Sequence, residues 1–137
     1  MGKYKTKTKQ YSGTSYSEII SKARREYHAI QAKTPRRIPY IRSGYFTKDK
    51  IFINNFWDHL NSKSSRDRVR RLKLYSCSIE LIRKSNETPD TVQNPNNKEE
   101  LLHRFQGATV DGMDFVVQIK ENKKTGRKDF ISSFPAK

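Results

Sequence analysis

Cysteine is almost missing from this chain, which has only Cys77 among its 137 residues. One thiol cannot form an intramolecular disulfide, and it cannot supply the ligands of a cysteine-based zinc site. The sequence also lacks an apolar run long enough to span a bilayer and an apolar stretch followed by a cleavage site. We therefore expect a cytoplasmic protein with no membrane partner.

Motifs that carry familiar chemistry are missing as well. The sequence has no phosphate-cradling glycine motif, no zinc-ligand spacing and no glycine-flanked nucleophilic serine. Histidine occurs only at His28, His59 and His103. No metal and no other cofactor is expected, and any acid–base chemistry would depend on very few side chains.

Positive charge is abundant. Lys and Arg number 29 against 14 acidic residues, which gives a formal net charge of +15 and a pI near 10.1. Such a surplus repels itself in a compact chain, and it is typical of a protein that binds a polyanion. The alternative is a protein that is basic only for solubility, although acidic residues would serve that purpose as well.

The first third of the chain holds most of this charge. Through residue 48 there are twelve Lys or Arg and two acidic residues, which is +10 of the +15. Residues 1–14 read as a disordered basic tail, because nothing there can be buried. In residues 15–48, Ser15 and Glu18 form a capping box for a helix that ends before Pro35, and a basic linker follows. The linker is either an arm that lies on nucleic acid or a flexible leader.

A compact domain is predicted over 49–137. A short strand or buried segment at 51–53 precedes a short helix capped by Asn54 or Asn55, and Ser64 and Asp67 begin a longer helix. Its buried line would be Val69, Leu72, Tyr75, Ile79 and Ile82. After a polar loop over 85–98, three strands follow at 102–109, 113–121 and 128–134, with Asp111-Gly112 as a hairpin turn between the first two.

This order of elements predicts an α+β fold. We expect a basic N-terminal helix and linker, then two helices packed on a three-or-more-stranded antiparallel sheet, with the helices on one face. Strand alternation would leave the other face open. That open face would carry cations and hydrogen-bond donors able to hold a phosphate: Arg104, Gln106, Gln118, Lys120 and Ser133.

RNA cleavage would need little more than such a face. The 2′-hydroxyl is the nucleophile, so the protein supplies a general base, a general acid and cations for the phosphorane. His103 is the preferred acid or base, with a strand-end structural histidine as the alternative. His59 is the second choice, with a helix-surface residue beside Asp58 as the alternative, and His28 is taken as surface. Glu121 is a further possible base or a surface carboxylate.

Further cations are expected to bind nucleic acid or, alternatively, to be solvated surface. They lie on helix faces, in the linker and around the last turn: Lys22, Arg24, Arg25, Arg36, Arg37, Arg42, Arg66, Arg70, Lys73, Lys123, Lys124 and Arg127. Three aromatic residues near Arg42 could stack on bases or pack against the domain: Tyr40, Tyr45 and Phe46.

The sequence from about Ile51 to Pro135 resembles a nuclease family. The segments that carry the likeness are Leu102-His103-Arg104-Phe105 with Gly107, Phe115-Val116-Val117-Gln118-Ile119-Lys120-Glu121, and Phe130-Ile131-Ser132-Ser133-Phe134-Pro135. They resemble the phage-type barnase/EndoU/colicin/RelE-like (BECR-fold) nucleases. The resemblance implies a small α+β domain and a metal-independent ribonuclease, often a toxin of a mobile element or conflict system. It implies a site at His103, Arg104, Lys120 and Ser133, with Ser132 as a possible addition.

Three hypotheses follow. The first is a metal-independent endoribonuclease, with RNA favoured over DNA as the partner. The second is a non-catalytic RNA- or DNA-binding accessory or ribosome-associated protein, because the basic third lies outside the family pattern and no glutamate is clearly placed as a base. The third is a protein-interaction partner such as an antitoxin or inhibitor.

Overall fold

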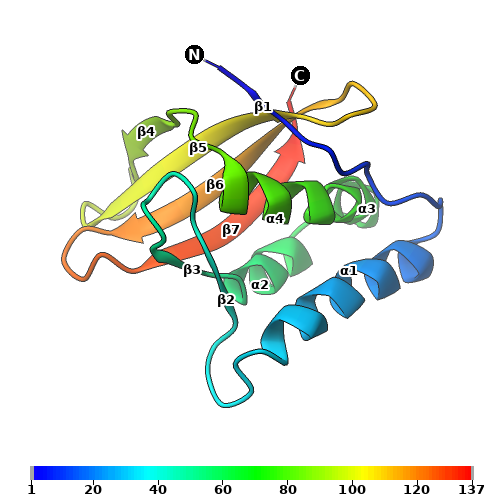
Figure 1. Cartoon of the computed structure of the whole chain (residues 1–137), viewed down its shortest axis with the longest axis horizontal. Coiled ribbons are helices and arrows are strands. Elements are labelled where there is room, and N and C mark those ends of the chain that lie inside the picture. Colours follow the sequence, from blue (N-terminus) through cyan, green and yellow to red (C-terminus); the bar gives the residue numbers. More distant parts are fainter. Residues whose placement is uncertain (1, 137) are drawn as a thin grey trace.

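The computed structural model describes residues 2–136, and the seven strands of this part of the chain join one curled, mixed sheet (Figure 1). The central strands are β5 (Glu100–Ala108), β6 (Asp114–Asn122) and β7 (Lys128–Pro135), which pair antiparallel. The predicted meander is therefore confirmed. Gly112 turns the first hairpin at φ +93° and Gly126 turns the second at φ +77°. Glycine adopts these positive φ values without the steric cost that a side chain would add.

The N-terminal part of the chain extends this sheet at both edges. Beyond β7 lie β3 (Lys50–Phe52), parallel to it, and then β2 (Tyr40–Arg42). The outer edge of β5 is shared by β4 (Asp90–Gln93) and by β1 (Tyr4–Lys5), which is parallel to it. The strand order is β1-β5-β6-β7-β3-β2, with β4 also on β5.

The helices are α1 (Tyr16–Gln31), α2 (Asn55–Asn61), α3 (Ser65–Lys73) and α4 (Tyr75–Lys84). Two predicted caps are present, since Ser15 Oγ accepts from the Glu18 amide at 3.2 Å and Ser64 Oγ from the Asp67 amide at 3.3 Å, whereas Asn54 precedes α2 without a side-chain capping hydrogen bond. The expected single long helix is divided at Leu74 into α3 and α4. Neither part is long and apolar enough to cross a membrane, and the same holds for the other helices of residues 2–136.

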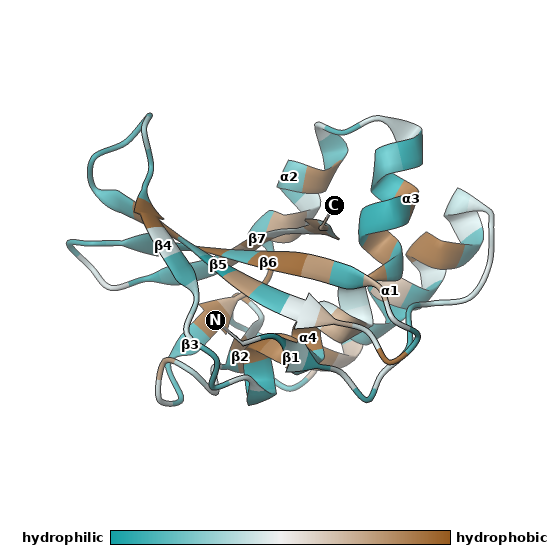
Figure 2. Cartoon of the chain, turned by 90° about the horizontal axis from the view of Figure 1, so that it is seen from above, coloured by the Kyte–Doolittle hydropathy of each residue, from teal (hydrophilic) through white to brown (hydrophobic). Residues whose placement is uncertain are grey.

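The predicted arrangement of two helices on one face of an antiparallel sheet is wrong. Residues 2–136 form four helices and seven strands, and the sheet is mixed. Figure 2 shows α2 and α3 across β7 from α4, and all three helices contribute to one core, in which Phe56 of α2 stacks on Phe130 with centroids 4.8 Å apart. The coarse α+β character and the antiparallel β5–β7 meander agree with the prediction, whereas the number of helices and the mixed sheet do not. The segments of β2 and β3 are too short to reveal a strand from sequence alone, and the pairing that joins them to the sheet is with β7, far along the chain.

The main core lies on the α4 side of the sheet. Phe105, Phe115, Val117 and Phe130 point there and are almost fully buried. Leu81 of α4 approaches Gly107 so closely that a β-carbon at that glycine would lie 2.7 Å from its methyl group. A larger residue at this position would therefore displace the side chain of Leu81 or of Phe115 where α4 crosses β5.

Residues 2–14 differ from the disordered tail that their composition predicts. The Thr6 amide donates to the Ala108 carbonyl at 2.9 Å, and the Tyr4 hydroxyl donates to Glu80 at 2.7 Å. The Glu80 carboxylate also accepts from the amides of Lys7 and Thr8, at 2.9 and 3.0 Å. One carboxylate on α4 thus fixes a basic segment that has little apolar surface of its own.

The pKa of Glu80 should reflect this role. Partial burial acts to raise it, but hydrogen bonds from Thr8, Tyr4 and Lys7 outweigh burial and lower it. A carboxyl whose folded pKa is lowered stabilises the fold above its unfolded pKa, and that contribution is lost as the pH falls through the folded value. The N-terminal segment should therefore detach in acid.

We predict that Glu80→Ala frees the N-terminal segment. Amide hydrogen exchange over residues 4–8 should become fast, and the free energy of unfolding should fall by about 1–2 kcal/mol. Glu99→Ala is the matched control, because Glu99 pairs with Lys124 on the exposed surface. Exchange that is equally slow in both variants would contradict the anchoring role of Glu80.

Candidate functional site

The four residues predicted to form one site lie on opposite faces of the sheet. His103 and Ser133 are buried on the α4 side, where their strand partners are Ile119 and Val117. Arg104 and Lys120 point to the other side. Adjacent residues of a strand face opposite ways, so His103 and Arg104 cannot act on one phosphate.

A β-bulge reverses the expected positions of the two serines. The register of β6 and β7 shifts between Gln118 and Ile119, so that Ile119 pairs with Phe130 but Gln118 pairs with Ser132. The extra residue in β7 is Ile131. Ser133 therefore turns into the core, where its hydroxyl is buried without a hydrogen-bond partner, and Ser132 joins the face of Lys120.

His103 belongs to a buried polar network. Its Nδ1 lies 2.8 Å from Thr91 Oγ1 and its Nε2 lies 2.7 Å from Glu121 Oε1. Glu121 also lies 3.8 Å from the Lys128 ammonium, which donates to Asp49 at 2.8 Å. Both ring nitrogens are engaged and only 6% of the residue is exposed, so His103 is held as a structural residue.

The loop between β2 and β3 covers this network. Phe46 packs edge-on against the His103 ring, with centroids 5.0 Å apart, and Tyr45 packs against Phe105 at 5.6 Å. Tyr45 and Phe46 were predicted either to stack on bases or to pack against the domain, and these contacts are packing contacts. Thr47 and Lys48 follow at positive φ, 53° and 70°, so the loop turns sharply behind the two rings.

A groove of about 550 Å³ opens on the other side of the sheet, between α2 and β6. Eight residues line it: Asn55, Asp58, His59, Ser62, Asn94, Glu100, Lys120 and Ile131. His59 and Asp58 come from α2 and are exposed, whereas Lys120 comes from the sheet and is half-buried. The groove thus combines an imidazole, an ammonium and carboxylates within reach of solvent.

Partial burial and the nearby positive charges favour the neutral form of His59. Partial burial lowers the pKa of the His59 imidazole, and the positive charges of Lys63 and Arg71 lower it further. Arg71 is fixed on α3 by Asp67 at 3.0 Å and by the Ser132 hydroxyl at 2.6 Å, and it lies over the Phe134 ring. A neutral imidazole beside fixed cations is suited to accept a proton.

Lys120 is positioned by its neighbours on the same face. Its ammonium lies 3.7 Å from Glu100 Oε2, and Asn94 donates to the other oxygen of Glu100 at 3.0 Å. Farther along the sheet, Arg104 donates to Gln118 at 2.9 Å and remains exposed. Within residues 2–136, no three His, Cys, Asp or Glu side chains are grouped closely enough to hold a metal ion.

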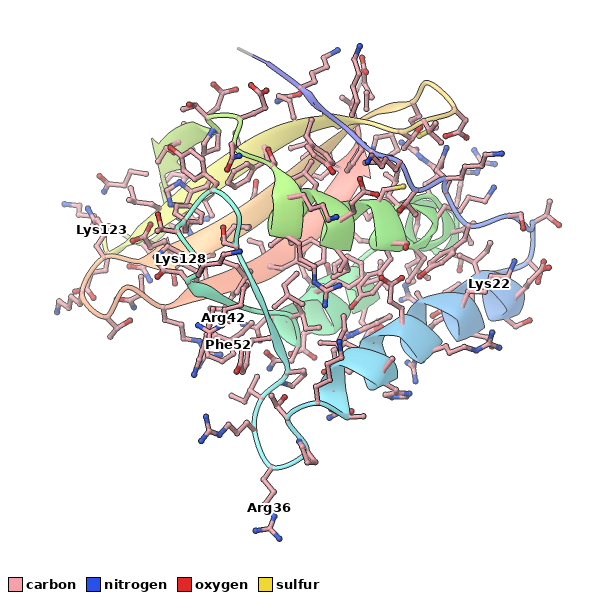
Figure 3. All side chains as sticks on the ribbon, in the orientation of Figure 1. Lys22, Arg36, Arg42, Phe52, Lys123 and Lys128 are labelled. Atoms are coloured by element: carbon pink, nitrogen blue, oxygen red, sulfur yellow. The ribbon has the colours of Figure 1, made fainter. Side chains whose placement is uncertain are left out.

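The other predicted nucleic-acid contacts do not form one patch. Figure 3 shows Lys22 on α1, Arg36 below α1 and Lys123 at the β6–β7 hairpin, well separated from one another. Some are engaged within the protein: Lys22 donates to Ser12, and Arg24 lies 5.6 Å from the Trp57 ring centroid. Arg25, Arg37, Arg66 and Arg70 are exposed, Lys73 is half-buried, and Lys124 pairs with Glu99.

The groove was only partly foreseeable. His59 was the second choice for a catalytic histidine, and Lys120 was expected on the open face. Arg71, Asn94 and Glu100 were missed, because a helix arginine, a loop asparagine and a strand-end glutamate have no distinctive local pattern. Only the contact between α3 and β7 shows that Arg71 belongs beside Ser132.

Comparisons with known proteins add no relative. No family model, no curated protein and no solved structure matches this chain.

We predict that His103→Ala lowers the free energy of unfolding by about 2–4 kcal/mol, because the change removes buried packing and leaves Thr91 and Glu121 unpaired. Urea denaturation measures this loss. The control is His59→Ala, which removes an exposed ring and should change stability by less than about 0.5 kcal/mol. Equal effects of the two substitutions would show that His103 is not structural.

We also predict that the His59 ring titrates below its ordinary value of 6.5 in an NMR pH series. Arg71→Gln should raise the midpoint by removing a nearby cation, while the burial effect remains. Arg83→Gln on α4 makes the same change in charge and should leave the midpoint where it is. A midpoint at or above 6.5 in the unmodified protein would contradict the assigned environment.

Proposed function

We propose that this protein binds RNA and cleaves it as a metal-independent endoribonuclease, with the groove between α2 and β6 as the active site. The observation that carries the proposal is the presence of His59 and Lys120 in one solvent-open groove. The net charge of +15 supports a polyanionic substrate. The proposed catalytic histidine is therefore His59, and not His103, which the sequence favoured.

The reaction would follow from the chemistry of the groove. Neutral His59 takes the proton of the 2′-hydroxyl, and the 2′-oxygen forms a bond to phosphorus as the bond to the 5′-oxygen breaks. Lys120 stabilises the phosphorane, and its ammonium can give a proton to the departing 5′-oxygen. The products are a 2′,3′-cyclic phosphate and a 5′-hydroxyl end. Arg71 adds positive charge beside Ser132.

The likeness to the phage-type BECR-fold nucleases supports the same activity. In those proteins the exposed face of an antiparallel sheet is the expected site, and here the groove lies on the face of Gln118 and Lys120 within the antiparallel β5–β7 sheet. A toxin role in a mobile element or conflict system is part of this proposal and rests on the resemblance alone.

A second candidate is a non-catalytic RNA- or DNA-binding protein. The specific observation in its favour is the pair of carboxylates, Asp58 and Glu100, that share the groove with His59. They repel a phosphate, and His59 is the single histidine among the described residues of the groove. This candidate predicts binding that weakens steeply with salt and yields no products.

The test is incubation of the protein with total RNA in EDTA, followed by a denaturing gel. We expect cleavage by the unmodified protein, a loss of about 100-fold or more for His59→Ala, and a clear loss for Lys120→Ala. His28→Ala is the control, because His28 is exposed on α1, outside the groove.

Two outcomes would decide against this active site. Full activity of His59→Ala would remove His59 from the reaction. Intact RNA with every variant, together with a mobility shift at low salt, would leave the non-catalytic candidate.

A further inference from the structure

A row of side chains crosses the sheet from the groove to its far edge. Directly paired residues of neighbouring strands share a face. Lys120 pairs with Asp129, Asp129 with Phe52, and Phe52 with Tyr40. Phe52 and Tyr40 therefore lie on the face of Lys120, and Phe52 is two strands away from it, about 10 Å.

The edge of the sheet beside Phe52 is a second groove, of about 460 Å³, at the start of β7. Four of its eight lining residues are cations and one is acidic. Arg42, Lys50 and Arg127 come from β2, β3 and the β6–β7 turn, so three separate segments bring positive charge together. Figure 3 shows Arg42 and Phe52 next to each other, with Lys128 nearby.

The aromatic rings are interleaved with these cations. Arg127 lies 4.4 Å from the Phe52 ring centroid, and Lys50 and Arg42 lie 4.8 and 5.2 Å from that of Tyr40. The two rings meet at 6.1 Å and are only partly buried. Tyr45 and Phe46, by contrast, are used for packing behind His103.

We propose that Tyr40 and Phe52, with Arg42, Lys50 and Arg127, form a platform that binds single-stranded RNA next to the active-site groove. The bases stack on the rings and the phosphates contact the cations, a combination typical of single-strand binding. The inference rests on the proposed function, because it names the substrate class of the same site. It also explains why RNA would be held across the sheet rather than only at Lys120.

Single strands fit this platform better than duplexes. Tyr40 and Phe52 project from the sheet, and only an unstacked base can place its ring against theirs. In a duplex the bases are covered by their neighbours, and the cations alone would remain as contacts.

The test is a fluorescence anisotropy titration with a labelled 2′-O-methyl oligouridylate of about 12 nucleotides. This RNA has no 2′-hydroxyl and cannot be cleaved by the proposed reaction, so binding is measured separately from catalysis. The comparison ligands are an RNA duplex of the same length and the DNA oligonucleotide of the same sequence.

Two pairs of variants distinguish binding at the platform from non-specific attraction to positive charge. Phe52→Leu keeps apolar bulk but removes the ring, and Tyr16→Leu removes a half-buried ring on α1 as its control. Arg42→Gln with Lys50→Gln is compared with Lys5→Gln and Lys7→Gln, two cations near β1 at the opposite end of the strand order. The second pair keeps the test decisive if Phe52→Leu fails to fold.

We expect Phe52→Leu to bind the single strand about fivefold or more weakly, with little change for the duplex. The Arg42/Lys50 pair should lose more affinity than the Lys5/Lys7 pair. Equal losses within each pair would overturn the platform, and tighter binding of the DNA single strand than of the RNA single strand would overturn its assignment to RNA.

The outcomes also distinguish the platform from the proposed reaction. Cleavage of total RNA that depends on His59, with no effect of Phe52→Leu on binding, would overturn the platform alone. No cleavage, with binding that depends on Phe52, would support the platform and overturn the nuclease.

Discussion

The alternation of side chains along three long antiparallel strands is the constraint on which the rest of this structure depends. It directs Phe105, Val117 and Phe130 toward α4, and it directs Arg104, Gln118 and Lys120 away from it. One extra residue in β7 changes the assignment locally, so Ser132 faces Arg71 while Ser133 is buried. The candidate site lies on the second face, where the polar side of α2 and Lys120 of β6 line one groove.

The two faces divide the polar side chains of the protein between a covered network and an open groove. On the covered face, a chain of contacts runs from Thr91 through His103, Glu121 and Lys128 to Asp49. It ties β4, β5, β6, β7 and the β2–β3 loop together, and low local dielectric strengthens each contact. On the other face, His59, Lys120 and Glu100 remain open to solvent, where a ligand can compete for their hydrogen bonds.

Predictions that depended on neighbouring residues were mostly correct, and those that depended on strand pairing between distant segments were not. Ser15 and Ser64 marked helix starts, and the hairpin at Asp111-Gly112 marked the meander, because caps and turns depend on neighbouring residues. The pairing of β3 with β7 and of β1 with β5 depends on segments far apart in the chain, so residues 2–14 were expected to be disordered. His103 was favoured over His59 because its position beside Arg104 in a strand resembles a site, although alternation separates the two side chains.

The origin of the sheet's strands has a consequence for how the protein is made. The outer strands β1, β2 and β3 are synthesised first, but each pairs with another strand of that early segment or with β5 and β7, which lie in the last forty residues. Strands that are far apart in sequence pair slowly, because a long loop must close before the contacts between them can form. The sheet therefore cannot assemble until β7 has been made, so the groove beside Lys120 and the groove beside Phe52 are completed in the same step.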